Sequence, residues 1–273
     1  MTDSTTAERF LELHHGDTPL LLANAWDAGS ARLLEALGYT ALATTSSGFA
    51  ATLGRLDGSV TRDEALAHGA TVAGAVGVPV SADLEDCFAA DPAGVAETVR
   101  LAIESGLAGG SIEDFTRRPD DPIYEPGEAV ERVAAAAEAA HAGGPRYVLT
   151  ARAENYLHGR PDLADTIARL QSFQEAGADV LYAPGVIAPD DVRELVRSVD
   201  RPVNVLVLPG GPTVAELGEL GVARVSVGGA FAYAALGALV EAAEELQEQG
   251  TYGYSTTAGV GRNAARAAFG QPA

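Results

Sequence analysis

A unit made of a helix, a glycine and a short apolar strand recurs along this sequence and restricts the folds that the chain can adopt. Residues 33–38 read Leu-Leu-Glu-Ala-Leu-Gly ahead of the strand-like run 41–45, and the unit returns at 102–106, 173–177 and 217–221. Glycine is favoured just after a helix, and a continuous apolar run is typical of a strand covered on both faces. The chain is therefore expected to alternate helices with buried parallel strands.

Counting these units along the chain gives eight strands and eight helices. The expected strands lie near residues 20–25, 41–46, 79–84, 109–113, 147–152, 179–184, 202–208 and 224–228. The expected helices lie near residues 28–37, 62–76, 93–105, 127–141, 162–176, 189–198, 213–220 and 231–248. The alternation favours an α/β fold of the (β/α)₈ TIM barrel type over a doubly wound sheet, which has fewer units and a glycine-rich turn after its first strand. One barrel domain is expected over residues 1–273.

Three further segments stand apart from this pattern. The connections 47–61 and 115–126 are longer than most, and long loops at the carboxyl ends of barrel strands are where a lid would lie. Residues 250–273 contain an alanine-rich run after the eighth unit. We expect an extra C-terminal helix there, which either caps the barrel or packs on a neighbouring subunit.

The overall charge and composition exclude several classes of partner. The net charge of −20 argues against nucleic acid and anionic membrane, because both require a basic surface. No apolar run is long enough to cross a bilayer, and the first residues lack a basic leader and an apolar signal segment, so a cytoplasmic protein is expected. The single cysteine, Cys87, excludes an internal disulfide.

Acidic side chains follow several of the expected strands. Asp83 and Glu85 end the third strand, Glu113 ends the fourth, and Asp57 lies in the long connection after the second. Because the carboxyl ends of barrel strands face one cavity, these carboxylates are expected to converge, and four of them would repel one another without a cation. Hard oxygen ligands suggest Mg²⁺, or Mn²⁺ in its place, with Asp83 as the direct ligand. The alternative is that the acids after these strands, such as Asp86 and Asp114, cap the helices that follow.

Other residues at the same end of the barrel suit an anionic substrate. Arg152 ends the fifth strand, where its planar guanidinium could hold a carboxylate or pair with a neighbouring acid instead. Asn204 lies in the seventh strand and either points into the barrel mouth or is a satisfied interior amide. The run after the second strand offers hydroxyls and unhindered backbone N–H groups to an anion: Thr45, Ser46, Ser47 and Gly48.

Taken together, these motifs resemble the phosphoenolpyruvate mutase/isocitrate lyase superfamily. The resemblance runs through residues 24–31, 53–57, 83–86, 111–114 and 151–154. It implies a (β/α)₈ barrel whose Mg²⁺ is held near Asp83, with Glu85, Asp57 and Glu113 acting mostly through water. It implies that a 2-oxo acid or its enolate binds the metal, that Thr45–Gly48 and Arg152 hold the acidic groups of the substrate, and that Asn204 lies nearby. It also implies a homo-oligomer, a dimer or tetramer, in which the last barrel helix is exchanged between subunits.

The chain departs from that superfamily in the loop after the fourth strand. Residues 115–122 read Phe-Thr-Arg-Arg-Pro-Asp-Asp-Pro, without the Lys-Cys-Gly-His type sequence of the lyases and without the Lys and Asn pattern of the phosphonomutases. Cleavage of isocitrate or methylisocitrate by the usual route is therefore not expected. Cys87 does not match that loop, and among the histidines only His158 is placed to approach the site.

The sequence thus leads to one main hypothesis and its alternatives. The main hypothesis is a Mg²⁺-dependent lyase or decarboxylase that acts on a small 2-oxo or 2-hydroxy dicarboxylate through a metal-stabilised enolate, with Asp57, Glu113 and Arg152 as catalytic residues. The first alternative is a phosphonopyruvate-type C–P enzyme, either a mutase or a hydrolase. A second alternative is a barrel that only binds a metabolite. A third is a phosphate-binding barrel, which the glycines within 209–212 and 228–229 suggest.

Overall fold

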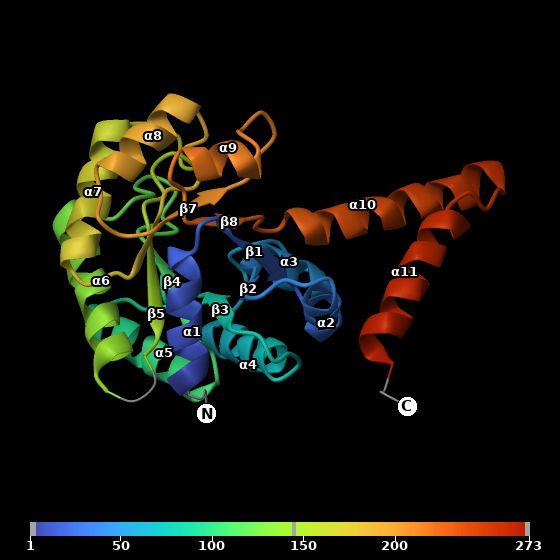
Figure 1. The fold of residues 1–273 in the computed structure, drawn as a ribbon, viewed down its shortest axis with the longest axis horizontal. Coiled ribbons are helices and arrows are strands. Elements are labelled where there is room, and N and C mark those ends of the chain that lie inside the picture. The colour runs from blue at the N-terminus through green and yellow to red at the C-terminus, as the bar shows by residue number, and fades with distance from the viewer. Residues whose placement is uncertain (1–3, 144–145, 271–273) are drawn as a thin grey trace.

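Eight parallel strands form a closed barrel in the computed structural model, which describes residues 4–143 and 146–270 (Figure 1). The strands are β1 Leu20–Ala25, β2 Leu42–Thr44, β3 Val80–Asp83, β4 Gly109–Glu113, β5 Val148–Arg152, β6 Val180–Tyr182, β7 Val203–Leu206 and β8 Arg224–Ser226. Each strand pairs with its neighbours in chain order, and β1 closes the barrel on β8 through Leu22 and Ser226. The expected fold class and all eight expected strands are confirmed.

The helices that alternate with these strands also lie where the sequence predicts them. They are α2 Ala28–Ala36, α4 Arg62–Ala73, α5 Pro92–Glu104, α6 Pro126–His141, α7 Leu163–Glu175, α8 Pro189–Arg197, α9 Val214–Glu219 and α10 Ala230–Glu244. Asp91 begins α5 by accepting a hydrogen bond from the backbone N–H of Gly94 at 2.8 Å. Gly106, just beyond the end of the same helix, has a φ of +87°, a conformation that glycine adopts without strain.

The N-terminal end of the barrel is closed by two elements that the sequence pattern does not predict. They are the helix α1, Ser4–Glu12, and the 3₁₀ turn η1, Leu13–His15. Phe10 of α1 is fully buried in a small apolar cluster with Leu20, Val148 and Val180 of the barrel strands. This end is therefore sealed by packed side chains, which leaves the opposite end for the site.

The connection after β2 is partly helical, which corrects the expectation of a long loop over residues 47–61. Helix α3, Ser46–Thr52, fills its first half. Thr45 is the N-cap, and its hydroxyl accepts a hydrogen bond from the backbone N–H of Gly48 at 3.3 Å. The connection after β4 contains no helix, and a bridge between Phe115 and Ile123 ties its two ends together, so that loop is confirmed.

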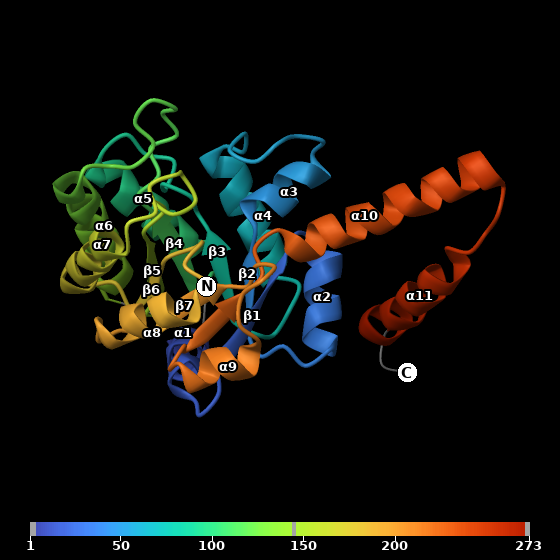
Figure 2. The ribbon, with the colours of Figure 1, turned by 90° about the horizontal axis from the view of Figure 1, so that it is seen from above.

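The C-terminal segment leaves the barrel as an arm (Figures 1 and 2). Helix α10 starts beside α3 and projects away, the π-helical turn η2, Glu245–Gln249, extends it, and α11, Ser255–Phe269, turns back. The expected extra helix is confirmed as α11, which packs against α2 of its own chain. Within α10 only Ala232 is buried, so most of this apolar helix is exposed. Across residues 4–143 and 146–270, no helix is both long and apolar enough to span a membrane.

Candidate active site

A cavity of about 240 Å³ opens at the carboxyl ends of the barrel strands. Its lining is mostly polar and includes Asn24, Thr44, Thr45, Ser46, Ser47, Asp57, Ser81, Asp83, Ser111, Arg152, Tyr182, Asn204, Arg224 and Ser226. Most of the site residues expected from the sequence therefore share one cavity. Glu85 lines a much smaller hollow that adjoins it through Asp83, and Glu113 reaches it through Arg152. A wider hollow at the opposite end of the barrel, lined partly by Leu20, Leu21 and Leu37, holds no comparable group of acids.

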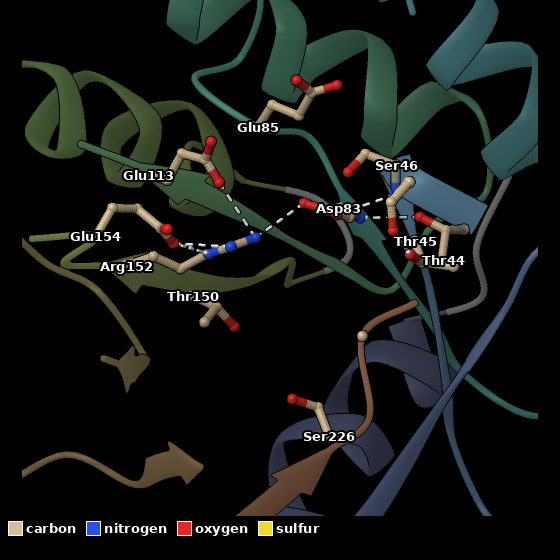
Figure 3. Close-up of polar contacts among 12 residues, drawn as sticks. Thr44, Thr45, Ser46, Asp83, Glu85, Glu113, Thr150, Arg152, Glu154 and Ser226 are labelled. Carbon is tan, nitrogen blue, oxygen red and sulfur yellow. Dashed lines mark hydrogen bonds and ion pairs between the residues drawn. The ribbon is translucent and has the colours of Figure 1, made fainter. Parts of the chain in front are cut away.

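Asp83 lies at the centre of this site, at the end of β3. Its Oδ2 accepts a hydrogen bond from the backbone N–H of Ser46 at 3.0 Å, and its Oδ1 lies 3.0 Å from Nη1 of Arg152 (Figure 3). The backbone N–H of Asp83 donates to Oγ1 of Thr44 at 2.9 Å. The carboxylate is thus held by the start of α3 and by the last residue of β5, and it faces the cavity that both of them line.

Arg152 stands among three carboxylates at the end of β5 (Figure 3). Its guanidinium lies 3.0 Å from Asp83, 3.2 Å from Glu113 and 2.7 Å from Glu154. Burial disfavours the charged guanidinium, but these three acids raise the pKa of Arg152 above its ordinary range. The ring of Tyr182 lies 5.1 Å from the guanidinium carbon. Arg152 therefore stays charged and pairs with neighbouring acids, which was one of the two interpretations from the sequence, and its role in holding a substrate carboxylate stays a prediction.

Two further carboxyl groups are buried beside this arginine. Burial, together with the charge of Asp83, raises the pKa of Glu85 to about 8, and burial also raises the pKa of Glu113 well above its ordinary range. Oε1 of Glu85 is buried and has no hydrogen-bond partner. The backbone of Glu85 has a φ of +51°, a conformation that a non-glycine residue rarely adopts. Burial and the neighbouring acids thus both disfavour the charged forms of these carboxyl groups.

Arg117 is a site residue that the sequence analysis missed. It lies in the loop after β4, with its Nη2 2.5 Å from Oε2 of Glu85 and 3.2 Å from Oδ1 of Asp86. Its guanidinium also lies 5.2 Å from the centre of the Phe88 ring. The sequence of an irregular loop does not indicate which residue its arginines contact, although Arg117 and Arg118 are the only cationic residues of this loop. The loop therefore brings its own cation to a carboxylate that was expected near a metal.

The segment Thr45–Gly48 differs from the open anion-binding loop expected there. Its backbone N–H groups at Ser46 and Gly48 already donate to Asp83 and to Oγ1 of Thr45. Gly48 lies inside the first turn of α3, where a Cβ atom would come within 3.1 Å of Trp26 and Ala232. Ser46 and Ser47 face the cavity, so the segment offers hydroxyls to a ligand, whereas Gly48 serves the packing of α3.

The remaining expected residues have different surroundings. Asp57 is exposed on the loop after α3, yet it lines the cavity. Asn204 is buried, and both ends of its amide are used, by Ser226 and by Arg224. His158 stacks on Phe115 with ring centres 3.9 Å apart, and its Nε2 lies 3.8 Å from Glu154. Cys87 is fully buried in the core.

The donor set fits a divalent cation, although no preassembled cluster is present. Among the described residues, no three His, Cys, Asp or Glu side chains are arranged to hold a metal. The unpartnered Oε1 of Glu85 and the raised pKa values of Glu85 and Glu113 nevertheless indicate an excess of carboxylates around one cavity. Oxygen ligands of this kind suit Mg²⁺, and Arg152 and Arg117 supply positive charge to them in this structure.

Comparison with known proteins gives a consistent family. The sequence matches the family described as phosphoenolpyruvate phosphomutase over residues 10–247. A crystal structure of a candidate lyase/mutase from Burkholderia cenocepacia J2315 superposes with a TM-score of 0.94, at 50% identity over 98% of this chain and 97% of that chain.

Relatives with named activities fall into several reaction classes. A 2-methylisocitrate lyase of Escherichia coli K12 is 29% identical over 205 residues, which cover 72% of this chain and 68% of the relative. Oxaloacetate decarboxylase 2 of Pseudomonas fluorescens Pf0-1 is 30% identical over 256 residues, 89% and 84% of the two chains. A 2,3-dimethylmalate lyase of Eubacterium barkeri is 26% identical over 93% of this chain and 89% of its own. A chloroplastic carboxyvinyl-carboxyphosphonate phosphorylmutase of Arabidopsis thaliana is 26% identical over 89% and 75%.

Proposed function

Because this chain belongs to the phosphoenolpyruvate phosphomutase family, we propose that it is a lyase or decarboxylase acting on a small 2-oxo or 2-hydroxy dicarboxylate. The observation that carries the proposal is that Arg152 and Asp83 line one cavity, with Glu113 and Glu154 paired to Arg152 behind it. The names of the 2,3-dimethylmalate lyase and the oxaloacetate decarboxylase among its relatives point to short dicarboxylates. A cavity of about 240 Å³ suits substrates of that size.

We assign Mg²⁺, or Mn²⁺ in its place, to the acidic side of this cavity. Asp83 would be the direct ligand, because its carboxylate faces the cavity, and Glu85, Glu113 and Asp57 would act mostly through water. When bound, the cation would supply positive charge that stabilises the negative charge developing on the substrate during bond cleavage.

The protein side chains would bind and orient the substrate. Glu154 and the ring of Tyr182 fix the guanidinium of Arg152, which would then hold a substrate carboxylate without reorganising. The hydroxyls of Ser46 and Ser47 face the same cavity from α3 and would donate to the same anionic group. Because Asp83 and Glu113 also share Arg152, its hold on a substrate would depend on a cation that binds those two acids.

Two other functions remain as second candidates. The family description and the phosphorylmutase among the relatives favour a C–P enzyme, although residues 115–122 lack the lysine expected for one. The ion pair between Arg117 and Glu85 favours a barrel that binds a metabolite without turnover, because it occupies a carboxylate that the metal would need.

NMR of pooled substrates would test the three functions together. The purified protein is incubated with oxaloacetate, alkylmalates, methylisocitrate and phosphonopyruvate, with Mg²⁺ or with EDTA, and followed by ¹H and ³¹P spectra. Metal-dependent cleavage of a dicarboxylate is the expected result, above the spontaneous loss measured without protein. A new ³¹P signal from phosphonopyruvate would support the C–P enzyme, whereas no turnover of any compound would refute the proposed enzyme activity on these classes.

We also propose that the chain forms a homo-oligomer through its C-terminal arm. The exposed residues of the arm include Leu239, Val240 and Val260, and β1 leaves Leu21 partly exposed on the barrel. Burying such apolar side chains against a second copy would remove them from water. Light scattering after gel filtration should give at least a dimer for the natural chain and a monomer for the double variant Leu239→Glu, Val240→Glu. A natural chain that elutes as a monomer would refute this.

A further inference from the structure

The inside of the barrel holds an arginine that the proposed function does not use. Arg224 is the first residue of β8, and its side chain crosses the barrel interior with only 3% of its surface exposed. Its Nε donates to Oδ1 of Asn204 at 2.9 Å, its Nη2 donates to Oγ1 of Thr150 at 3.1 Å, and its Nη1 lies 3.2 Å from Nε2 of His14. These partners belong to β7, β5 and η1, so the guanidinium is fixed from three sides.

Within the described parts of the chain, 4–143 and 146–270, no carboxylate lies within ion-pair distance of Arg224. His14 is neutral, because burial and then the charge of Arg224 lower its pKa to about 3, and it accepts at Nε2 while Nδ1 donates to the carbonyl of Phe10 at 2.8 Å. A buried charge of this kind is costly unless an anion accompanies it.

The cavity of the candidate active site reaches this cation. Arg224 lines the same cavity as Arg152 and Asp83, together with the small polar residues Ser81 and Ser226. Large branched apolar residues usually fill a barrel at this depth, so small side chains here leave room for a ligand. Figure 3 shows Thr150 and Ser226 on the side of Arg152 that faces away from Glu85. We call the surface formed by Asn204, Arg224 and Ser226 the cavity floor.

The two ends of the cavity differ in charge. At the mouth, three carboxylates share the guanidinium of Arg152, whereas at the floor no carboxylate among the described residues pairs with Arg224. Three of the five N–H donors of Arg224 are used, so two remain for a planar acceptor such as a carboxylate.

We propose that Arg224 binds the second carboxylate of the substrate and thereby selects dicarboxylates over monocarboxylates. This inference rests on the proposed function, in which the first carboxylate lies at the mouth near Arg152. Asn204 is then a positioning residue, since its amide holds Nε of Arg224 and is itself held by Ser226. Two fixed cations at opposite ends of one cavity set the length of the dianion that fits.

Calorimetric titration with malate and lactate in the presence of Mg²⁺ tests this inference, because the two compounds differ by one carboxylate. We expect the natural protein to bind malate at least about tenfold more tightly than lactate, the effect of one added charge-assisted contact. Arg224→Met should abolish that preference by weakening malate binding about tenfold or more, with lactate binding changed less than about threefold. Arg100→Met, which removes an exposed arginine from the pair with Glu97, is the matched control and should bind malate as the natural protein does.

A purely structural role for Arg224 would predict a different outcome. Loss of structure would weaken malate and lactate equally, and a circular dichroism spectrum would reveal unfolding. If Arg224→Met does not fold, Arg224→Lys carries the test, because it keeps the charge but loses the planar fork and should reduce the malate preference about threefold or more.

The inference and the proposed function can fail separately. An unchanged malate preference in the folded Arg224 variants would overturn the inference, as would a natural protein that does not distinguish malate from lactate. A malate preference that depends on Arg224, combined with no turnover of any dicarboxylate by NMR, would refute the proposed activity alone.

Discussion

His14 gives the most quantitative prediction, because both of its ring nitrogens are committed in the neutral form. Nδ1 donates to the carbonyl of Phe10 at 2.8 Å, and Nε2 accepts from Arg224 at 3.2 Å. Protonation would place a new N–H against the guanidinium. Burial, then the charge of Arg224, therefore lowers the pKa of His14 from 6.5 to about 3. We consider the substitution His14→Gln, whose amide can both donate and accept and does not titrate.

The lowered pKa translates into a dependence of stability on pH. Between pH 3 and 6.5 the unfolded chain binds a proton at this histidine and the folded chain does not, so stability rises with pH in that window. The contribution is fully present above the unfolded pKa and is lost as the pH falls below it. At pH 5, which is 1.5 units below the unfolded pKa of 6.5, the loss relative to pH 8 is about 2 kcal/mol.

Urea unfolding at pH 8 and pH 5 measures this quantity. The free energy of unfolding of the natural protein should fall by about 2 kcal/mol more between these pH values than that of His14→Gln. Other titrating groups, such as His68 and Glu85, are common to both chains and cancel in the comparison. His15→Gln is the control, because it replaces an exposed histidine next to His14 and leaves His14 in place, so the variant should keep most of the extra loss of stability at pH 5. Equal pH dependence in the natural chain and His14→Gln would refute the reasoning.

Three further substitutions address the site and the packing of the barrel. Asp83→Asn keeps the shape of the side chain that would bind the metal directly, and should lower Mg²⁺-dependent turnover about a hundredfold with an unchanged circular dichroism spectrum; unchanged activity would exclude Asp83 as a ligand. Arg117→Met removes the cation beside Glu85 and should tighten Mg²⁺ binding about threefold or more, measured by calorimetry. The control Arg118→Met removes the partner of Asp121 and should leave Mg²⁺ affinity unchanged, and equal affinities in the two variants would show that Arg117 does not compete with the metal. Gly110→Ala would place a Cβ atom 2.0 Å from the buried hydroxyl of Tyr147 and should lower the free energy of unfolding by about 1–3 kcal/mol. The control Gly127→Ala adds its Cβ atom in open space on α6 and should not destabilise the protein, whereas a Gly110→Ala variant as stable as the natural protein would mean that Tyr147 moves aside without cost.

The strands and the meeting of acids at their ends were predictable from the sequence, because each depends on a local pattern. A buried parallel strand must be apolar along its length, and a glycine must follow the helix before it, so residues 102–113 identify a helix and a strand without knowledge of the fold. Once the strands are placed, the barrel brings Asp83 and Glu113 to its carboxyl end.

The residues that were missed depend on contacts with no local pattern. Arg117 lies in an irregular loop, and its partner Glu85 is 32 positions away. Arg224 lies within an expected strand, but the alternation of side chains along a strand does not show whether an arginine enters the barrel or faces solvent. That choice depends on the contact with His14, which lies 210 positions away at the barrel end. The helix α3 was missed because a polar Thr-Ser-Ser-Gly run suits a turn as well as a helix start, and the packing of Gly48 on Trp26 and Ala232 favours the helix.

The charges of the site explain how an acidic chain would capture an anionic substrate. The net charge of −20 repels a dicarboxylate at long range, and Arg152 alone does not reverse this, since Asp83, Glu113 and Glu154 share it. A cation bound to the acids of the cavity would free N–H donors of Arg152 for the substrate. The proposed metal and Arg152 would therefore bind the substrate cooperatively. Arg224 is different, because no acid in the described part of the chain pairs with it, so it attracts an anion whether or not a metal is bound. Malate should therefore retain part of its preference over lactate in EDTA, and this residual preference should disappear in Arg224→Met.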